Sequence, residues 1–492
     1  MEIWAKCRAG FKNRLPQYML NLLMLFIFWG GLLRKSYNYD TVYHMVVDDA
    51  DVMTRIRGGR YAAALIDYLL LKLELRTTSN ISITIFFSLI VFAAAMLIMQ
   101  LIFERYMPDD KWAKAGFYCG LNLVFLNVLF AELLMFSEYS IYYALAYLAA
   151  AAGVFYFIRG KYLPMLLMYV TAVSFYQNAV VYAAILAAFY IYLDEKTLLS
   201  LRAVGREIAA VTTCIAIGAL DLLSIRVLEK LNMIPLSAKV SGMGNMAEKL
   251  SEAAASFVSL NKNAAGIFPN LWLPLLFAAL IWIMIIYSRI KEQNFLGIIF
   301  LFIVCLGSYI LLYIIPFASI DFYFPPRLSF CFFMINGLLM VSSYAVSIKS
   351  LHRLLGIAGV FYIFIHLFFS GLIVSDHFVS NSLDEVYVNM LYDEIVRYEN
   401  ETGIEVKKLA VMKDAYSPSV YPQVDVASGQ INERVIDAVP VSIVQVVTGR
   451  VLERVDMPRD IRERYFKDKD WDYFSPKEQI VIEGDTVYWC IF

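Results

Sequence analysis

The sequence predicts an α-helical, multi-pass membrane protein with about eleven transmembrane helices and a small α/β domain at its C-terminal end. Of its 492 residues, 60% are hydrophobic and 17% are charged, and the mean hydropathy is +0.62. Soluble domains are less apolar and about 25% charged. Apolar runs of about twenty residues, enough for a helix to cross a hydrocarbon core of about 30 Å, recur through residues 1–374. Charged residues become frequent from 375 to 492, where no such run remains.

Charged breaks separate the predicted spans. The first run follows a basic stretch, as in a signal peptide, but Arg34 and Lys35 rather than small residues come after it, so we expect a retained span. The fifth and sixth runs are short and meet at 176–178, which predicts either a tilted pair or a hairpin that does not fully cross. The predicted spans are 18–33, 81–103, 115–131, 140–157, 162–176, 178–193, 208–228, 269–287, 295–315, 328–347 and 354–374.

Basic residues concentrate in the loops of one parity. In the short loops of the other parity, Arg327 is the only basic residue. These loops are 132–139, 176–178 and 316–327. Because Lys and Arg resist translocation, we expect the N-terminus and the basic loops to be cytoplasmic. An odd number of spans then places the long loops 34–80 and 229–268 and the domain 375–492 outside. The basic loops carry Arg105, Lys111, Lys114, Arg159, Lys161, Lys196, Arg202, Arg206, Arg289, Lys291, Lys349 and Arg353.

The segment 375–492 has the pattern of a small mixed domain. A helix is expected near 383–402, because apolar residues recur at helical spacing before Gly403. Strands are expected at 405–412 and at the pair 479–483 and 486–492, which Gly484-Asp485 joins as a hairpin. In the first long loop, the amphipathic stretch 61–73 is expected to lie along the membrane interface.

Several function classes are disfavoured by what the sequence lacks. The net charge of −1 gives no reason to expect a nucleic-acid partner. The four histidines have no metal-ligand spacing, the six cysteines form no CxxC pair, and His366 is expected to pack between helices. The chain contains no phosphate-binding glycine loop, which argues against a cytosolic nucleotide-sugar donor. We therefore expect neither a metal nor a cofactor.

The first long loop crowds acidic and basic residues together. If 47–57 is helical, then Asp48, Asp51 and Arg55 share one face, and Asp49 points elsewhere. Adjacent carboxylates raise each other's pKa, whereas one beside a guanidinium stays ionised, which suits a general base. The alternative is an ordinary surface pair of Asp51 with Arg55 among solvated charges. Because desolvation at a membrane boundary is costly, the functional interpretation is favoured.

The order of these motifs carries a family resemblance. The motifs are Asp48-Asp49, Arg55 and Gly59-Arg60 in the first loop, the Tyr176-Gln177 turn, Arg327 at the start of a late span, and the closing segment 479–492. With this pattern and span count, the chain resembles the bacterial glucosyltransferases typified by phage-encoded serotype-converting enzymes, which are polytopic members of the GT-C class. The resemblance touches most of the chain, although each motif is short.

The resemblance implies an inverting glycosyltransferase in the bacterial plasma membrane. Such an enzyme moves a sugar, here glucose, from a polyprenyl-phosphate carrier to a cell-surface glycan on the outer side, without a metal. It implies that Asp48 or Asp49 activates the acceptor hydroxyl. Bidentate guanidinium groups suit phosphate, which makes Arg55, Arg60 and Arg327 candidates for binding the carrier.

Other candidate ligands have equally simple structural explanations. Glu138, with Glu132 in the same short loop, is a candidate to orient the acceptor, and interface solvation explains both acids as well. Tyr176 and Gln177 are candidates to hydrogen-bond the sugar, or simply residues of a tight turn. Arg327 is either a phosphate ligand or a snorkelling anchor at a helix end.

Two other function classes compete with glycosyl transfer. A transporter or lipid-linked sugar flippase would carry ionisable residues within its spans and two related halves. Here Asp221 is the only clear acid in the middle of a span, and no two-half correspondence is visible. A polysaccharide polymerase or assembly protein is also polytopic, but its active loops come late in the chain, whereas this charge cluster follows the first span.

Overall fold

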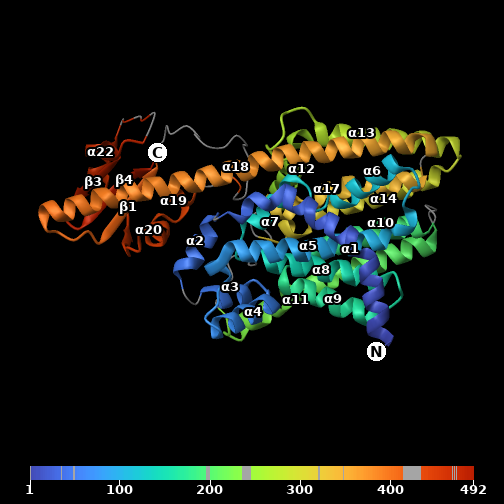
Figure 1. Ribbon diagram of the computed structural model, residues 1–492, viewed down its shortest axis with the longest axis horizontal. Helices are drawn as coiled ribbons and strands as arrows, with labels where there is room; N and C mark the ends of the chain where they lie inside the picture. The colour runs from blue at the N-terminus through green and yellow to red at the C-terminus, as the bar shows by residue number, and fades with distance from the viewer. Residues whose placement is uncertain are drawn as a thin grey trace.

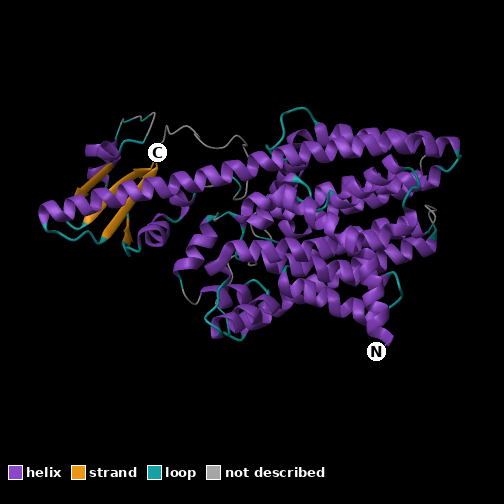
Figure 2. Ribbon diagram, in the orientation of Figure 1, coloured by secondary structure: helices purple, strands orange, loops and turns teal. Residues whose placement is uncertain are grey.

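Long helices lie side by side and form a bundle, and a small sheet stands at one end of it (Figures 1 and 2). The computed structural model describes residues 2–34, 36–47, 50–195, 200–234, 245–319, 322–346, 348–413, 431, 434–467, 469, 471 and 474–491. The side chains of 2–12, 50–51 and 79 lie outside this description.

Within the described residues, eight helices are long and apolar enough to cross a membrane. They correspond to α1 Glu2–Trp29, α5 Ile81–Phe103, α8 Ser140–Phe157, α11 Leu201–Lys230, α13 Leu273–Lys291, α14 Phe295–Leu312, the pair α16 Pro326–Ser329 and α17 Cys331–Val346, and α18 Lys349–Thr402. Two shorter apolar helices, α9 Tyr162–Phe175 and α10 Ala179–Asp194, meet at the predicted turn. The chain is therefore a multi-pass membrane protein, as its composition predicts.

The third predicted span, 115–131, is not one helix. The helix α6 Lys111–Asn122 ends in turns, and the short helices η4 Val128–Phe130 and α7 Ala131–Met135 follow. Asn127 stabilises the break, because its side-chain amide donates to the carbonyls of Leu123 and Val124 and its oxygen accepts from the Leu129 N–H. Irregular backbone survives at membrane depth only where protein buries it, and these residues are buried. The prediction of a continuous helix here was wrong. Hydropathy measures only how apolar a segment is, and it does not show that a side chain such as Asn127 can hydrogen-bond the backbone groups at a break.

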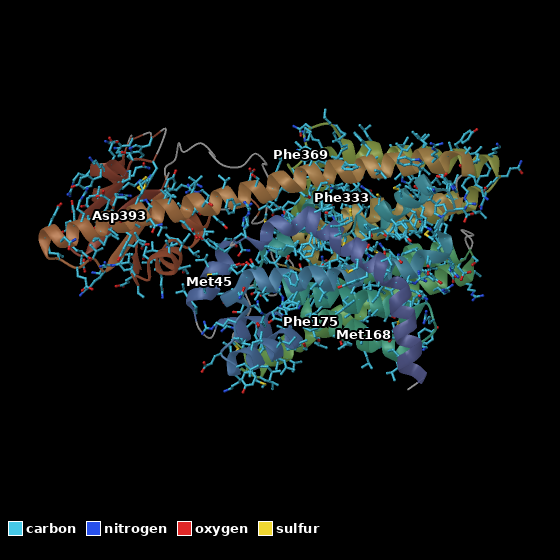
Figure 3. All side chains as sticks on the ribbon, in the orientation of Figure 1. Met45, Met168, Phe175, Phe333, Phe369 and Asp393 are labelled. Atoms are coloured by element: carbon cyan, nitrogen blue, oxygen red, sulfur yellow. The ribbon has the colours of Figure 1, made fainter. Side chains whose placement is uncertain are left out.

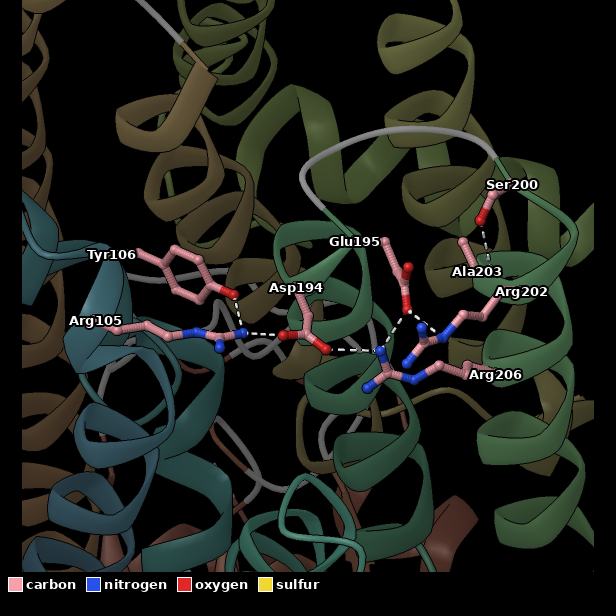
Figure 4. A network of polar contacts seen from close by, with 8 residues as sticks. All are labelled: Arg105, Tyr106, Asp194, Glu195, Ser200, Arg202, Ala203 and Arg206. Atoms are coloured by element: carbon pink, nitrogen blue, oxygen red, sulfur yellow. Dashed lines mark hydrogen bonds and ion pairs between the residues drawn. The ribbon is translucent and has the colours of Figure 1, made fainter.

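One end of the bundle gathers the basic loops. Arg105 pairs with Asp194, and the Asp194 carboxylate also accepts from Arg206 Nη1 at 2.6 Å (Figure 4). Glu195 joins the network through Arg206 at 2.5 Å and Arg202 at 3.6 Å. Two loops that the charge pattern assigned to one side, the one after α5 and the one between α10 and α11, are thus bound to each other.

The opposite end holds the first long loop and the C-terminal sheet (Figure 1). The loop folds into the helices α2 Tyr39–Val46, α3 Ala50–Arg57 and α4 Tyr61–Lys72. The last of these covers the amphipathic stretch 61–73, whose position along the membrane interface stays a prediction. The second long loop contains α12 Met246–Asn263. Because the N-terminal helix starts at the basic end and the sheet lies at the other, the chain runs between the ends an odd number of times.

The helix α18 continues from the bundle into the C-terminal region. The span expected at 354–374 and the helix expected near 383–402 are one helix of 54 residues, so the predicted domain boundary at 374/375 falls inside it. No Gly or Pro occurs between 372 and 402, so nothing in the sequence stops the helix. At 1.5 Å per residue it is about 80 Å long, far more than a bilayer core requires. Asp393 lies on its far part, beside the sheet (Figure 3).

The C-terminal sheet has, within the described residues, the strand order β2-β1-β4-β3. The strand β1 Lys408–Lys413 is parallel to β2 Glu453–Val455 and to β4 Thr486–Ile491, and β3 Ile480–Glu483 pairs antiparallel with β4. The three predicted strands and their hairpin at Gly484-Asp485 are confirmed. The short β2 was not predicted, nor were the helices α19 Val435–Ala438, α20 Pro440–Thr448 and α22 Pro476–Gln479.

The C-terminal region is bound to the start of the first long loop. Tyr37 N–H donates to Asn381 Oδ1 at 2.8 Å, and the Asn381 amide donates back to Tyr37 O at 3.0 Å. The Tyr37 hydroxyl also reaches Glu385 at 2.8 Å, and α2 packs against α19 and α20. The helix α2 therefore lies between the C-terminal region and the bundle.

The basic loops and the C-terminal sheet lie at opposite ends of the bundle. A reagent that cannot cross the membrane should therefore label an introduced cysteine at one end and not at the other. Lys161 is exposed between α8 and α9 at the basic end, and Glu401 is exposed near the end of α18. We expect a membrane-impermeant maleimide added to intact cells to label Glu401→Cys and not Lys161→Cys. The parent chain is the control, because Cys490 is fully buried in β4. Labelling of both variants from one side would contradict an odd number of crossings.

Candidate functional site

The candidate site lies where the first long loop meets the ends of α8, α9 and α11. Figure 3 shows Met168 and Phe175 in succession along α9, toward the end of the bundle where Met45 of α2 lies. Asp48 and Asp49, the predicted catalytic residues, lie outside the described residues, as does the side chain of Asp51. In the sequence the pair directly precedes α3.

Arg55 of α3 is a buried charge at the centre of the site. Its side chain is fully enclosed, and Nε donates to Asp67 Oδ2 of α4 at 2.8 Å. The Tyr142 hydroxyl donates to the other oxygen of Asp67. The guanidinium carbon lies 3.4 Å from the centroid of the Tyr139 ring, a cation–π contact. Arg55 is therefore no solvated surface residue, and that alternative from the sequence is wrong.

Two nitrogens of Arg55 are left without partners. Nη1 and Nη2 are buried and have no hydrogen-bond partner among the described residues. A guanidinium carries five N–H donors and cannot lose its charge. An unsatisfied buried donor costs about 1–3 kcal/mol, and more when it is charged. These nitrogens are thus the strongest sign of a bound anion or polar ligand in the site.

A glycine turn brings Arg60 to the same aromatic ring. Arg60 N–H donates to Arg55 O at 2.9 Å, and Gly59 has a left-handed φ of +71°. The turn reverses the chain after α3, so the Arg60 guanidinium lies 5.2 Å from the Tyr139 centroid and 5.4 Å from that of Tyr176. Arg60 Nε is buried and has no partner within the described part of the chain.

Gln177 and Asp221 hold this turn against the bundle. The Gln177 amide donates to Gly58 O and, at 3.0 Å, to Asp221 Oδ2 of α11. A Cβ on Gly59 would lie 2.5 Å from Asp221 Oδ2, so only glycine fits here. Gln177 is a sugar-ligand candidate by its sequence position, and in the structure its amide nitrogen is bound to the turn that presents Arg60.

Glu138 is a buried carboxyl beside Tyr139. Its side chain is fully enclosed, and one oxygen accepts from the Thr41 hydroxyl of α2. The other oxygen, Oε1, has no partner among the residues described. His44 Nε2 lies 3.3 Å from the Tyr139 hydroxyl. Burial raises the pKa of Glu138 to about 7, although the charge of His44 and the Thr41 hydrogen bond oppose the rise.

Tyr176 and its neighbours form the aromatic wall of the site. The rings of Tyr176 and Tyr143 lie 4.5 Å apart, and Tyr143 stacks on Tyr139 with a centroid distance of 6.0 Å. Both Tyr176 and Tyr143 are buried, and the Tyr176 hydroxyl has no partner among the described atoms. Tyrosine faces of this kind can hold a sugar ring or a cation.

Arg327 is engaged by Glu132. Its Nη1 lies 2.7 Å from Glu132 Oε1, and its backbone N–H donates to Glu132 Oε2 at 2.8 Å. Its Nη2 donates to Tyr323 at 3.2 Å, and the guanidinium lies 4.7 Å from the Phe136 centroid. Because both Nη atoms of Arg327 already have partners, Arg327 has less capacity for a phosphate than Arg55, whose Nη1 and Nη2 have none among the described residues.

The fold thus brings most of the predicted site residues together. Arg55, Arg60 and Glu138 surround Tyr139, Tyr176 closes the aromatic wall, and Gln177 supports the turn. The sequence analysis missed Asp67, His44, Tyr139 and Tyr142. Their contacts join positions far apart in the sequence, so only clustered tyrosines at 139–147 could have drawn attention to them. Among the residues described, no group of three or more His, Cys, Asp or Glu could hold a metal ion.

Comparison with protein-family models, with curated proteins and with solved structures gives no match to this chain. The family resemblance based on the sequence motifs therefore stays a hypothesis.

Removal of the partner of Arg55 should destabilise the protein. Asp67→Asn leaves a buried, uncompensated guanidinium, and breaking such a pair costs about 3–5 kcal/mol. The control is Asp460→Asn, because Asp460 and Arg464 form an exposed pair, for which a loss below about 1 kcal/mol is expected. Unfolding titrations in detergent measure both variants. Equal losses would show that Arg55 does not depend on Asp67.

The tight turn predicts different effects of alanine at two glycines. Gly59 and Gly160 both have a positive φ, but a Cβ at Gly160 would meet nothing within 4 Å. Both substitutions carry the backbone cost of about 1 kcal/mol, and only Gly59→Ala also displaces Asp221 and Gln177. We expect Gly59→Ala to lower the unfolding midpoint clearly more than Gly160→Ala. Equal midpoints would mean that the turn is not closely packed.

Proposed function

We propose that this protein is an inverting membrane glycosyltransferase. It moves a sugar, glucose by family resemblance, from a polyprenyl-phosphate carrier to a surface glycan at the extracytoplasmic face of the bacterial plasma membrane. The observation that carries the proposal is on buried Arg55, whose guanidinium nitrogens Nη1 and Nη2 have no hydrogen-bond partner in the described part of the chain.

A phosphate group suits these nitrogens better than a neutral ligand does. Nη1 and Nη2 lie side by side on a planar group and can donate to two phosphate oxygens in parallel. The Arg55–Asp67 pair is neutral as a unit, and the nearby Arg60 adds positive charge. Tyr139 and Asp67 hold Arg55 in place, so binding would require little side-chain ordering.

The proposed chemistry is a single displacement. An acceptor hydroxyl oxygen bonds to the anomeric carbon of the sugar while the bond to the carrier phosphate breaks and the electron pair leaves with polyprenyl phosphate. The hydroxyl proton passes to a carboxylate, and attack opposite to the leaving group inverts the anomeric centre. By resemblance, the carboxylate is that of Asp48 or Asp49, which directly precede α3 in the sequence. The arginines stabilise the leaving phosphate.

Glycosyl transfer also explains the placement of the ionisable groups better than transport does. A transporter needs its ionisable groups along a path through the membrane. Here the unpartnered donors and the carboxyl gather around one tyrosine at one end of the bundle. A flippase would move the lipid-linked sugar without breaking its glycosidic bond, so product analysis separates the two functions.

The protein reconstituted with polyprenyl-phosphate glucose and a candidate glycan should release polyprenyl phosphate and glucosylate the glycan. Asp48→Asn or Asp49→Asn should lower kcat at least about 100-fold, as expected when a general base is lost. Arg55→Lys should raise the donor KM about tenfold or more, because lysine lacks bidentate geometry. Arg57→Lys is the matched control, since Arg57 is exposed on the same helix. Wild-type rates in Asp48→Asn, Asp49→Asn and their double variant would contradict the assigned base.

A further inference from the structure

Among the described residues, Glu138 has a buried acceptor atom without a donor, and Arg55 has buried donors without an acceptor. Glu138 Oε1 is buried and accepts from no described residue, whereas Arg55 Nη1 and Nη2 are buried donors with no acceptor among the same residues. His44 links the two groups, because its charge acts on the Glu138 carboxyl and its Nε2 lies 3.3 Å from the hydroxyl of Tyr139, the ring that Arg55 covers at 3.4 Å. A ligand that satisfies both must present an anionic oxygen to Arg55 and a hydroxyl donor to Glu138.

The turn before α8 and the helix α2 hold the Glu138 carboxyl in place. The turn before α8 carries it, and Thr41 of α2 donates to its other oxygen. His44, one turn further along α2, contacts Tyr139 with its rings 5.9 Å apart. The Asn38 side chain caps α2 by accepting from Thr41 N–H at 2.8 Å. The unpartnered oxygen is thus held at a defined position.

We propose that Glu138 is a further catalytic carboxyl, which accepts the proton of the acceptor hydroxyl during sugar transfer. This inference rests on the proposed function, and it assigns to Glu138 the proton that the family resemblance assigns to Asp48 or Asp49. The loss of about 100-fold in kcat that marks the base is therefore expected for only one of the two assignments. As the acceptor O–H bond breaks, its electron pair forms the bond to the anomeric carbon and the proton moves to Glu138 Oε1. The bond between sugar and phosphate breaks, and polyprenyl phosphate leaves on the arginine side.

The surrounding charges set the state of Glu138. From α2, His44 favours the ionised carboxyl and Asp40 disfavours it. From α3 and the glycine turn, Arg55 and Arg60 face the adjoining Tyr139 ring. Burial is the largest influence and raises the pKa of Glu138 to about 7. Because a base must be ionised to act, transfer should be slow below this pH and rise through about pH 7.

The decisive variant is Glu138→Gln, which keeps the side-chain shape and removes the base. We expect kcat to fall about 100-fold while the donor KM stays within about threefold, and the rise in rate near pH 7 to disappear. Glu74→Gln is the matched control, because Glu74 is an exposed carboxyl in the same long loop. His44→Gln and Thr41→Val retain Glu138 but remove influences that favour its ionised form, so both should move the rise to higher pH.

The outcomes separate the two proposals. No transfer by the wild type from any polyprenyl-phosphate sugar overturns the proposed function and this inference with it. An active wild type with an equally active Glu138→Gln variant overturns the role of Glu138 alone and leaves the base to Asp48 or Asp49. If Glu138→Gln does not fold, His44→Gln and Thr41→Val decide, and an unmoved pH profile in both overturns the inference.

Discussion

The ion pair between Arg55 and Asp67 organises the end of the bundle where the candidate site lies. It joins α3 to α4, and the Tyr142 hydroxyl on Asp67 ties both helices to α8. A guanidinium this deeply buried would be prohibitive alone. The Asp67 carboxylate pairs with Nε, and the Tyr139 ring faces the guanidinium. Nη1 and Nη2, which have no partner among the described residues, can then bind a ligand. Stability and binding therefore depend on the same side chain.

The helix α2 connects this site to the C-terminal region. On one side it packs against α19 and α20, and the preceding Tyr37 is bonded to Asn381 of α18. On the other side its Thr41 and His44 contact Glu138 and Tyr139. Because α18 is continuous from the bundle into the C-terminal region, that region is held at a defined position. Its attachment places α2, and with it the surroundings of Glu138.

The candidate site was only half visible in the sequence. Arg55, Arg60 and Glu138 stand out because charges are rare in such an apolar chain, and the structure brings them around one ring. Asp67 looked like one polar residue of an amphipathic helix, and Tyr139 like one aromatic among many. Pairing across α3, α4 and α8 depends on how the helices pack, which no local pattern encodes. The broken third span was missed for a similar reason, since Asn127 satisfies its backbone through contacts that hydropathy ignores.

The sequence by itself determined the class of protein, the positions of most of the long apolar helices and the C-terminal hairpin. Those features follow from local hydrophobicity, from helix-stopping glycine and from strand alternation, which act over a few residues. Only the tertiary structure decided that β1 pairs parallel with β4 and that Arg55 is buried against Asp67 and Tyr139. These outcomes depend on segments that are distant in the sequence and bury charged groups and backbone together. Such contacts contribute free energy only once the helices have packed.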